Sequence, residues 1–329
     1  MLVDSFGRVA TDLRVSLTDR CNLRCTYCMP PEGLDWLPKP ELLTDDEVVR
    51  LVGLAVTELG IREVRLTGGE PLLRKGLPGI VARITALSPR PEVSITTNAI
   101  GLARTADALA EAGLDRVNVS LDTLDAPTFK RLAHRDRLPD VLAGMAAAAH
   151  AGLTPVKVNA VLMRGINDHE APRLLEYCLQ MGYELRFIEQ MPLDAQHGWT
   201  REGMVTADEI LERLSAHFTL TPDDPRERGS APAERFLVGG GPERVGIIAS
   251  VTRPFCADCD RVRLTADGQI RNCLFAREES DLRKLLRSGA TDAEIIDAWK
   301  SAVQIKKAGH GIDDPTFLQP ARPMSAIGG

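Results

Sequence analysis

The chain alternates short β-rich segments with longer helical patterns from residue 12 to about residue 190. Runs rich in Val, Ile, Leu and Thr predict buried or half-buried strands at 13–17, 63–67, 92–97, 116–121, 156–162 and 184–189. Strands that alternate with helices indicate an α/β protein with a parallel sheet. Because crossovers between parallel strands are right-handed, such a sheet curls into an open sheet or a partial barrel.

The clearest helix between these strands is predicted from an apolar stripe at 48–59. Thr44 stands at its N-cap with Glu47 three residues later, and Gly60 follows as the C-terminal glycine. Further helices are predicted at 77–87, 105–112, 139–151 and 168–181.

The pattern changes after about residue 192. The elements predicted there are, in order, a helix (206–217), a polar surface loop with prolines (222–234), four strand-like runs (235–238, 244–251, 260–264 and 269–273) and a helix (291–306). Asp267-Gly268 joins the last two runs into a hairpin. We therefore divide the chain into a barrel core, 1–195, and a C-terminal extension, 196–329, that closes the barrel.

Length and composition describe a folded chain with room for about two domains. The 329 residues carry 40 Lys and Arg against 46 Asp and Glu, a formal net charge of −6. An acidic total argues against broad nucleic-acid binding, which needs a basic surface. The longest near-apolar run, 141–149, is too short for a membrane span, and no signal peptide is visible. The chain is expected in the cytoplasm, with neither nucleic acid nor membrane as a partner.

Seven cysteines are an odd number, and a reducing compartment disfavours disulfides. Cys21, Cys25 and Cys28 form one group directly after the first predicted strand. Thiolates are soft ligands that suit zinc or iron–sulfur clusters. A structural zinc takes four protein ligands, whereas a [4Fe–4S] cluster held by three cysteines keeps one iron open. A zinc site completed by a distant residue is the alternative.

Cys256, Cys259 and Cys273 form a second group of three, and a second [4Fe–4S] cluster is preferred over a zinc knuckle because no cysteine or histidine nearby completes it. Arg261 and Arg263 alternate along a predicted strand, so their side chains share a face. Such a pair beside an open iron suits a phosphorylated substrate, although two strand arginines can also be an exposed surface. The seventh cysteine, Cys178, sits at an apolar helix position and is predicted to be a buried structural thiol.

The first cysteine group, with Tyr27 before its last member, resembles the defining motif of the radical S-adenosylmethionine (SAM) superfamily. Thr67-Gly68-Gly69-Glu70-Pro71 resembles the segment that binds the SAM amino group, where glycines let backbone carbonyls approach an ammonium. The resemblance implies a partial (βα)6 barrel of the TIM type. It also implies that the open iron chelates SAM and that SAM cleavage yields a 5′-deoxyadenosyl radical.

The order of further motifs resembles the MoaA family of GTP 3′,8-cyclases. The matching segments are Thr18-Asp19-Arg20-Cys21-Asn22, Cys28-Met29-Pro30, Asn118-Val119-Ser120-Leu121-Asp122, Arg186-Phe187-Ile188-Glu189 and Ile327-Gly328-Gly329. The resemblance implies a lyase that converts GTP to (8S)-3′,8-cyclo-7,8-dihydroguanosine 5′-triphosphate. The radical would remove H-3′ of GTP, and this reaction would be the first step of molybdenum cofactor biosynthesis.

The same resemblance implies roles for individual residues. Tyr27, Gly69, Ser120 and Met191 match SAM contacts, and Arg14, Arg65, Thr96, Lys157, Arg186, Arg261 and Arg263 match GTP contacts. Arg261, Arg263, Gly328 and Gly329 match catalytic positions. Judged singly, each cation could form an ordinary salt bridge, and a glycine tail could be a flexible terminus. Several inward cations on one cavity favour a polyanionic ligand.

The resemblance further implies cofactors and partners. The cofactors are SAM and two [4Fe–4S] clusters, the second of which would hold the guanine base. The partners are GTP, an electron donor of the flavodoxin or ferredoxin type, and a cyclic pyranopterin monophosphate synthase of the MoaC family that receives the product. A homodimer is also expected.

Two positions depart from the family pattern, and two rival functions stay open. Glu63 replaces a common lysine, which puts one triphosphate contact in doubt. Ala99 replaces a common glycine, and alanine should be tolerated there if the backbone has a negative φ. The rivals are another two-cluster radical SAM enzyme, such as a peptide-modifying one, and a zinc-stabilised binding protein without catalysis.

Overall fold

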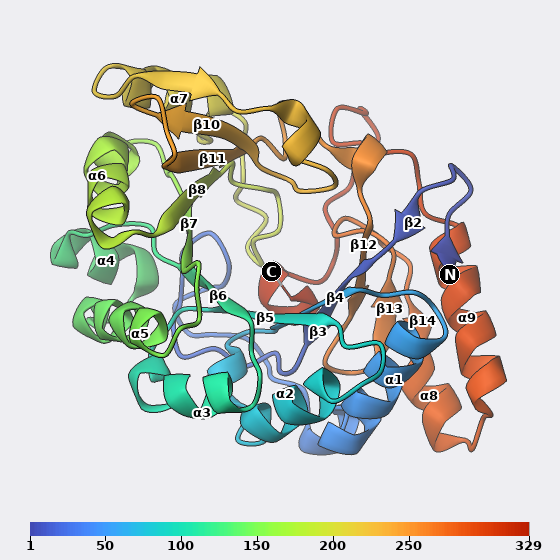
Figure 1. The fold of residues 1–329 in the computed structure, drawn as a ribbon. Coiled ribbons are helices and arrows are strands. Elements are labelled where there is room, and N and C mark those ends of the chain that lie inside the picture. Colours follow the sequence, from blue (N-terminus) through green and yellow to red (C-terminus); the bar gives the residue numbers. More distant parts are fainter. Residues whose placement is uncertain (329) are drawn as a thin grey trace.

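The computed structural model describes residues 1–328 and, of Pro225, the backbone alone. Its main element is a sheet of 12 strands that curls around the centre of the molecule (Figure 1). The six middle strands run parallel and confirm the predicted core: β3 (Asp12–Ser16), β4 (Glu63–Thr67), β5 (Glu92–Thr97), β6 (Arg116–Ser120), β7 (Lys157–Val161) and β8 (Glu184–Ile188).

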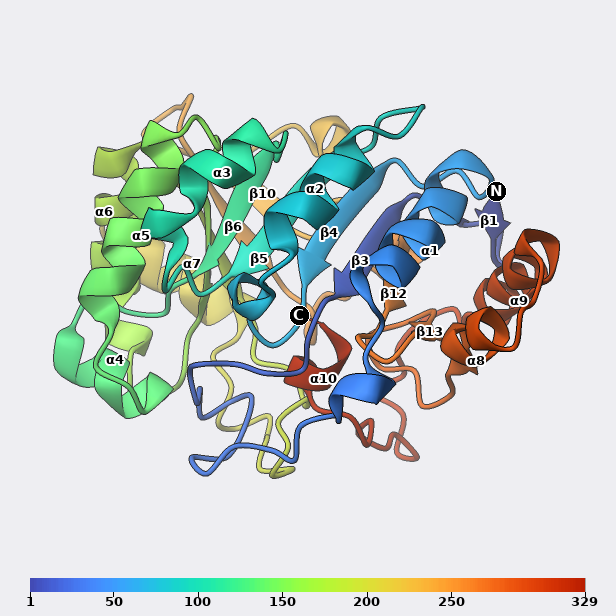
Figure 2. The ribbon, with the colours of Figure 1, turned by 90° about the horizontal axis from the view of Figure 1, so that it is seen from below.

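Helices cover the outer side of these strands, as Figure 2 shows for α1, α2 and α3 from below. They are α1 (Asp45–Thr57), α2 (Leu77–Thr85), α3 (Ala106–Glu111), α4 (Ala126–Ala133), α5 (Leu138–His150) and α6 (Ala171–Met181). The capping box of α1 forms as expected, because the Thr44 side chain accepts from the Glu47 amide and the Glu47 carboxylate accepts from the Thr44 amide. The sequence analysis missed α4.

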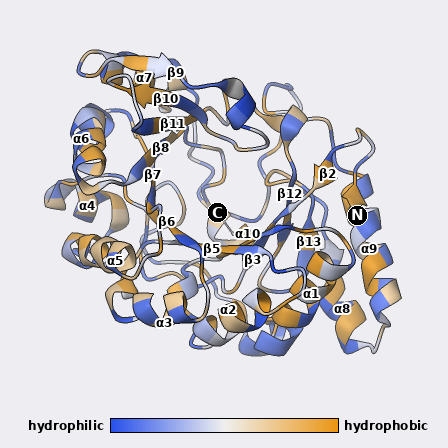
Figure 3. Ribbon diagram, in the orientation of Figure 1, coloured by the Kyte–Doolittle hydropathy of each residue, from blue (hydrophilic) through white to orange (hydrophobic). Residues whose placement is uncertain are grey.

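The side chains of the middle strands divide between the two faces of the sheet. In β4, Val64 and Leu66 are fully buried against the helices, and Arg65 between them points to the concave side. Hydrophobic and hydrophilic residues are likewise mixed on the covering helices (Figure 3). The concave side is therefore free to carry polar and charged groups.

The C-terminal extension adds strands to both edges of this core. On β8 it places β11 (Arg244–Ile248), β10 (Glu234–Val238) and β9 (Leu220–Pro222), and on β3 it places β12 (Arg261–Leu264), β13 (Gln269–Arg271) and β14 (Ser280–Asp281). The expected closure of the barrel is corrected: within residues 1–328, no strand pairing joins the edges β9 and β14. The extension lengthens a barrel that stays partial.

The remaining elements lie around this sheet. They are the hairpin β1 (Leu2–Val3) and β2 (Val9–Ala10), and the helices α7 (Ala207–Ser215), α8 (Leu282–Arg287), α9 (Asp292–Gln304) and α10 (Met324–Ile327). The C-terminal tail, where the sequence predicted no helix, forms α10, which lies near the centre of the molecule (Figure 1). No helix within the described part of the chain is long and apolar enough to cross a membrane.

Candidate active site

Two adjoining cavities lie on the concave side of the sheet. The smaller has a volume of about 160 Å³ and the larger about 250 Å³. The residues that line both are Tyr27, Thr96, Ser120, Asp122 and Met324. The first cysteine group lines the smaller cavity and the second lines the larger, so the two groups face each other across shared walls.

The first cysteine loop follows β3 and is held against the end of α4. The Arg24 amide donates to the Ala133 carbonyl at 2.9 Å, and the Thr26 amide donates to the Leu132 carbonyl at 3.0 Å. Burial raises the pKa of Cys21 to about 11 and that of Cys28 to about 12. Such thiols keep their protons unless a metal takes their place.

The Gly68-Gly69 pair lets this loop lie directly on the end of β4. A Cβ at Gly68 would stand 2.5 Å from the Thr18 carbonyl oxygen, and one at Gly69 would stand 2.2 Å from that of Arg20. The glycines are therefore required for packing inside the protein, a reason that the sequence interpretation did not include. Glu70 follows them and accepts from the Thr97 hydroxyl at 2.6 Å and from the Asn98 amide at 2.7 Å.

Tyr27 and Asp122 form a hydrogen bond between the two cavities. The Tyr27 hydroxyl donates to Asp122 Oδ2 at 2.7 Å, and the Val161 amide donates to Asp122 Oδ1 at 2.9 Å. Burial raises the pKa of the Asp122 carboxyl to about 6. Tyr27 is thus fixed in the wall that the two cavities share.

The second cysteine group has a different electrostatic environment. Burial raises the pKa of Cys256. Burial also acts to raise the pKa of Cys259, but the charges of Arg261 and Lys306 hold it below its ordinary value. Across residues 1–328, no three His, Cys, Asp or Glu side chains are spaced to hold a single metal ion. Each cysteine group nevertheless fits an iron–sulfur cluster, because its three thiols are close enough to interact electrostatically and line the same cavity.

Arginines form the wall of the larger cavity, and they are Arg14, Arg65, Arg186, Arg261 and Arg263. Arg263, Arg14 and Arg65 lie side by side, because strand pairing sets Arg14 opposite both of the others. Burial and the neighbouring Arg14 and Arg261 lower the pKa of Arg263 to about 9, and burial lowers that of Arg186 to about 10. Asp12 Oδ2 lies 3.3 Å from Arg14 Nη2 and compensates part of this charge.

Of the expected GTP contacts, Thr96 lines the cavity and Lys157 does not. Lys157 shares a strand face with Asn159 and Val161, which do line the cavity, but it lies at the start of β7. There its Nζ pairs with Glu184 Oε2 at 3.1 Å. Glu63, the residue in place of a common lysine, lies at the start of β4 and its Oε2 is 3.7 Å from Arg116 Nη2.

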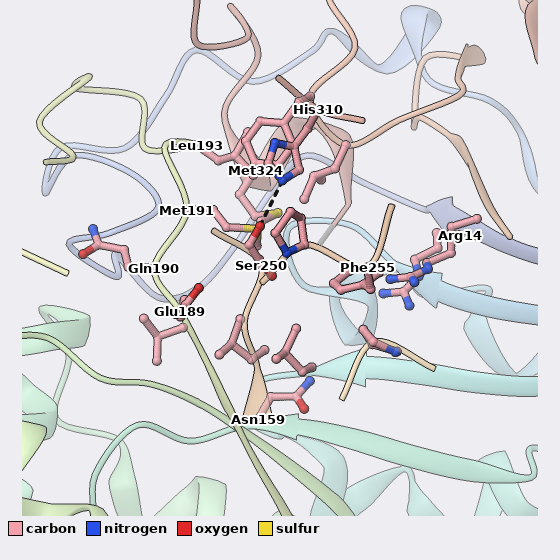
Figure 4. A pocket seen from close by; sticks show the side chains of 18 of the residues that line it. Arg14, Asn159, Glu189, Gln190, Met191, Leu193, Ser250, Phe255, His310 and Met324 are labelled. Carbon is pink, nitrogen blue, oxygen red and sulfur yellow. Dashed lines mark hydrogen bonds between the residues drawn. The ribbon is translucent and has the colours of Figure 1, made fainter. Parts of the chain in front are cut away.

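The C-terminal tail reaches the arginine wall. Arg263 Nη1 donates to the Gly328 carbonyl, and a Cβ at Gly328 would stand 3.0 Å from Thr67 Cγ2. Gly328 has φ +79°, which favours glycine. Gly329 lies outside the described residues. Met191 lines the same cavity, near Met324 and Leu193 in Figure 4.

The sequence analysis missed several wall residues. No role was assigned to any histidine, yet His310 lines the larger cavity, with Nε2 3.1 Å from the Ser250 carbonyl oxygen (Figure 4). Asn159 and Phe255 also line it. The spacing around His310 gave no signal, because the residue is brought to the wall by tertiary folding. Ala99 has φ +62°, so the condition under which alanine is easily tolerated at this position is not met.

Comparisons with known proteins agree with this geometry. Residues 15–178 match the radical SAM superfamily, and residues 183–312 match the family described as Molybdenum Cofactor Synthesis C. A GTP 3′,8-cyclase of Streptomyces coelicolor is 71% identical over 100% of this chain and 96% of its own length. One from Mycobacterium sp. (strain KMS) is 65% identical over 100% and 93%, and GTP 3′,8-cyclase 2 of Mycobacterium tuberculosis is 61% identical over 100% and 92%.

The solved structure of Streptococcus suis SuiB bound to S-adenosylmethionine is similar in fold. It has a TM-score of 0.58 and 14% sequence identity, and the match covers 88% of this chain and 68% of that one. At this identity the likeness concerns the fold alone.

Proposed function

This chain belongs to the GTP 3′,8-cyclase family of the radical SAM superfamily, and we propose that its two cavities divide the reaction between SAM and GTP. The chain is a GTP 3′,8-cyclase and performs the first step of molybdenum cofactor biosynthesis. SAM and an iron–sulfur cluster are its cofactors. The observation that carries the division is that five arginines line the cavity of the second group of three thiols, while the adjoining cavity of the first group is lined by no arginine among the described residues.

The smaller cavity is the proposed site of SAM. Cys21, Cys25 and Cys28 would hold the cluster there, which together with SAM supplies the radical that starts the reaction. Tyr27, Gly69, Ser120 and Met191 are the proposed SAM contacts; three of them line the smaller cavity, and Met191 approaches from the larger one. These residues orient SAM toward the shared wall and exclude water from it.

The larger cavity is the proposed site of GTP. Cys256, Cys259 and Cys273 would hold a second [4Fe–4S] cluster facing the guanine base. The proposed contacts of the nucleotide are Arg14, Arg65, Thr96, Lys157, Arg186, Arg261 and Arg263. A triphosphate matches this wall because guanidinium groups bind phosphate oxygens in pairs and because its charge compensates theirs. Lys157 contributes from beside the cavity, where Glu184 already binds it.

Arg261, Arg263, Gly328 and Gly329 are the proposed catalytic group. The contact between Arg263 and the Gly328 carbonyl supports this proposal, because it brings the tail to the arginines that line the larger cavity. Glycines suit this position because a side chain at Gly328 would press on Thr67 and Ser16. The tail and both arginines would then hold GTP with its ribose toward SAM and retain the cyclised product.

We further propose the partners and the setting of this reaction. The electron comes from a flavodoxin- or ferredoxin-type carrier, and the product passes to a cyclic pyranopterin monophosphate synthase of the MoaC family. The chain would act in the cytoplasm as a homodimer. Its core, 1–195, carries the SAM cluster, and its extension, 196–329, carries the second cluster.

An anaerobic incubation with GTP, SAM and dithionite tests this assignment. We expect 5′-deoxyadenosine, a cyclised nucleotide and about eight iron atoms per chain. Zinc without iron would contradict the cluster assignment. Arg263→Ala should cleave SAM but lose cyclisation, and removal of residues 328–329 should do the same. Normal cyclisation by either variant would remove that residue or segment from the catalytic group.

A further inference from the structure

Lys306 is a buried lysine directly behind the second cysteine group. Lys306 is 4% exposed and follows the end of α9. Its Nζ donates to the Cys259 carbonyl and the Arg261 carbonyl, each at 3.0 Å, and to Cys259 Sγ at 3.5 Å. No carboxylate in the described part of the chain lies within ion-pair distance of it. The function proposed above does not use this residue.

The three contacts match the three hydrogen atoms of an ammonium group, but only one of them can match its charge. Carbonyl oxygens are neutral, and a buried charge without a counter-charge is costly. The acceptor that can become negative is Cys259 Sγ. The pair is complete when Cys259 is a thiolate, which is the form that binds metal.

The loop that carries Lys306 is tied to the cysteine turn itself. The Arg8 side chain donates to the Cys256 carbonyl at 2.6 Å, to the Lys307 carbonyl at 2.6 Å and to the Ala308 carbonyl at 2.9 Å. The Lys306 amide donates to the Val303 carbonyl at 3.0 Å, which continues the fixed end of α9. Lys306 is therefore held in place independently of its contact with sulfur.

We propose that Lys306 is a positioning residue of the second cluster, whose fixed positive charge on Cys259 Sγ stabilises the reduced form of that cluster. The inference rests on the second cluster of the proposed function. A positive hydrogen-bond donor near a cluster sulfur favours the state with one more electron and therefore raises the reduction potential. Arg261 lies on the cavity side, where substrate is expected, so Lys306 exerts this effect whether or not substrate is bound.

The test compares Lys306→Met with Lys306→Arg and with Lys307→Met in the cluster-loaded enzyme. Lys307 is the matched control because it is the next residue and its side chain is exposed. We expect Lys306→Met to weaken reduction of the second cluster about tenfold, a potential lower by about 59 mV, in a titration followed by electron paramagnetic resonance. A chelator should remove its iron roughly tenfold faster. Lys306→Arg should keep most of the wild-type potential, and the first cluster serves as an internal reference.

Other outcomes separate the explanations. If Lys306 only ties α9 to β12, Lys306→Met would lower the thermal midpoint and leave the reduction potential of the second cluster unchanged. That result would overturn the proposal. If Lys306→Met does not load the second cluster, Lys306→Gln keeps a donor without the charge, and a wild-type potential in that variant would equally overturn it. An enzyme with about four iron atoms per chain would refute the second cluster itself, which is a failure of the proposed function.

Discussion

At the scale of single residues, the site depends on places where no side-chain atom can be added. Gly69 has the Arg20 carbonyl oxygen 2.2 Å from the position of a Cβ, and its amide donates to the Thr18 carbonyl at 2.6 Å. The backbone of the first cysteine loop therefore occupies the space that any other residue would need. Gly69 and the first cysteine group therefore pack as one unit, although Gly69 and Cys21 are almost 50 residues apart in the sequence.

We expect Gly69→Ala and Gly79→Ala to have opposite effects. The first forces the Cβ against backbone, which should lower the free energy of unfolding by about 3 kcal/mol and displace the first cysteine loop. Gly79 is exposed in α2 with no atom within 4 Å of the added Cβ, so alanine should stabilise the chain by about 0.4–1 kcal/mol. Urea unfolding and calorimetric SAM binding measure both effects. If Gly79→Ala weakened SAM binding, or if Gly69→Ala left SAM binding unchanged, the close packing around Gly69 would not be what the site depends on.

Residue chemistry could be predicted from the sequence where neighbours along the chain determine it. Cysteine spacing and the alternation of Arg261 and Arg263 are local patterns, and both arginines do line the larger cavity. Lys157 could not be placed, because its distance from the cavity depends on how far along β7 the cavity extends. The positive φ of Ala99 also depends on distant packing, since its carbonyl oxygen lies 2.4 Å from where Gly144 would carry a Cβ.

At the scale of elements, buried Glu189 connects the barrel core to the extension. It follows β8 and is 0% exposed. Its Oε1 accepts from the Ala207 amide at the start of α7 at 2.8 Å, and its Oε2 accepts from the Val251 and Thr252 amides at 2.8 and 2.9 Å. One carboxylate thus fixes the ends of β8 and β11 and the start of α7. Its contacts cross the boundary that the sequence pattern placed after residue 195.

Glu189→Gln should lower the free energy of unfolding by about 2–3 kcal/mol, because an amide group would set a donor against backbone donors that lose their acceptor. Glu212→Gln on the exposed face of α7 is the control, with an expected change within about 0.5 kcal/mol. Urea unfolding of both variants provides the comparison. Equal stability of the two would mean that water or a shifted backbone satisfies these amides.

Long periodic elements could be predicted, whereas short ones were located only in part. The six core strands and α1 carry patterns over 5 to 13 residues, and each was located. The helices α8 and α10 were missed; they have 6 and 4 residues, which leaves a period of 3.6 little length in which to repeat. Helix α10 forms because Ile327 is buried with Leu193 and Phe275, a cluster whose members come from distant parts of the chain. Closure of the barrel was wrong because strand pairing stops at β9 and β14.

At the scale of the whole molecule, positive charge is concentrated in one cavity although the chain as a whole is acidic. The chain has a formal net charge of −6, yet its larger cavity is lined by five arginines. Burial and neighbouring cations lower the pKa of Arg65, Arg261 and Arg263, which means that the folded chain holds these charges at a cost. A ligand with several negative charges removes that cost when it binds. The cavity therefore stores part of the driving force for binding a triphosphate.

This arrangement predicts that GTP stabilises the cluster-loaded enzyme much more than guanosine does. A ligand that binds only the folded chain adds about 2.7 kcal/mol at a hundred times its dissociation constant, so GTP should raise the thermal midpoint by several degrees. Guanosine offers the same base and ribose without charge, and at equal concentration it should raise the midpoint little. Added salt should reduce the difference only in part, because buried charges are screened less than exposed ones. Arg65→Met should remove much of the stabilisation by GTP. It should also raise the thermal midpoint of the free enzyme, because it deletes one of the cations that repel each other. Equal shifts of the wild-type midpoint by GTP and guanosine would instead place the phosphates outside this cavity.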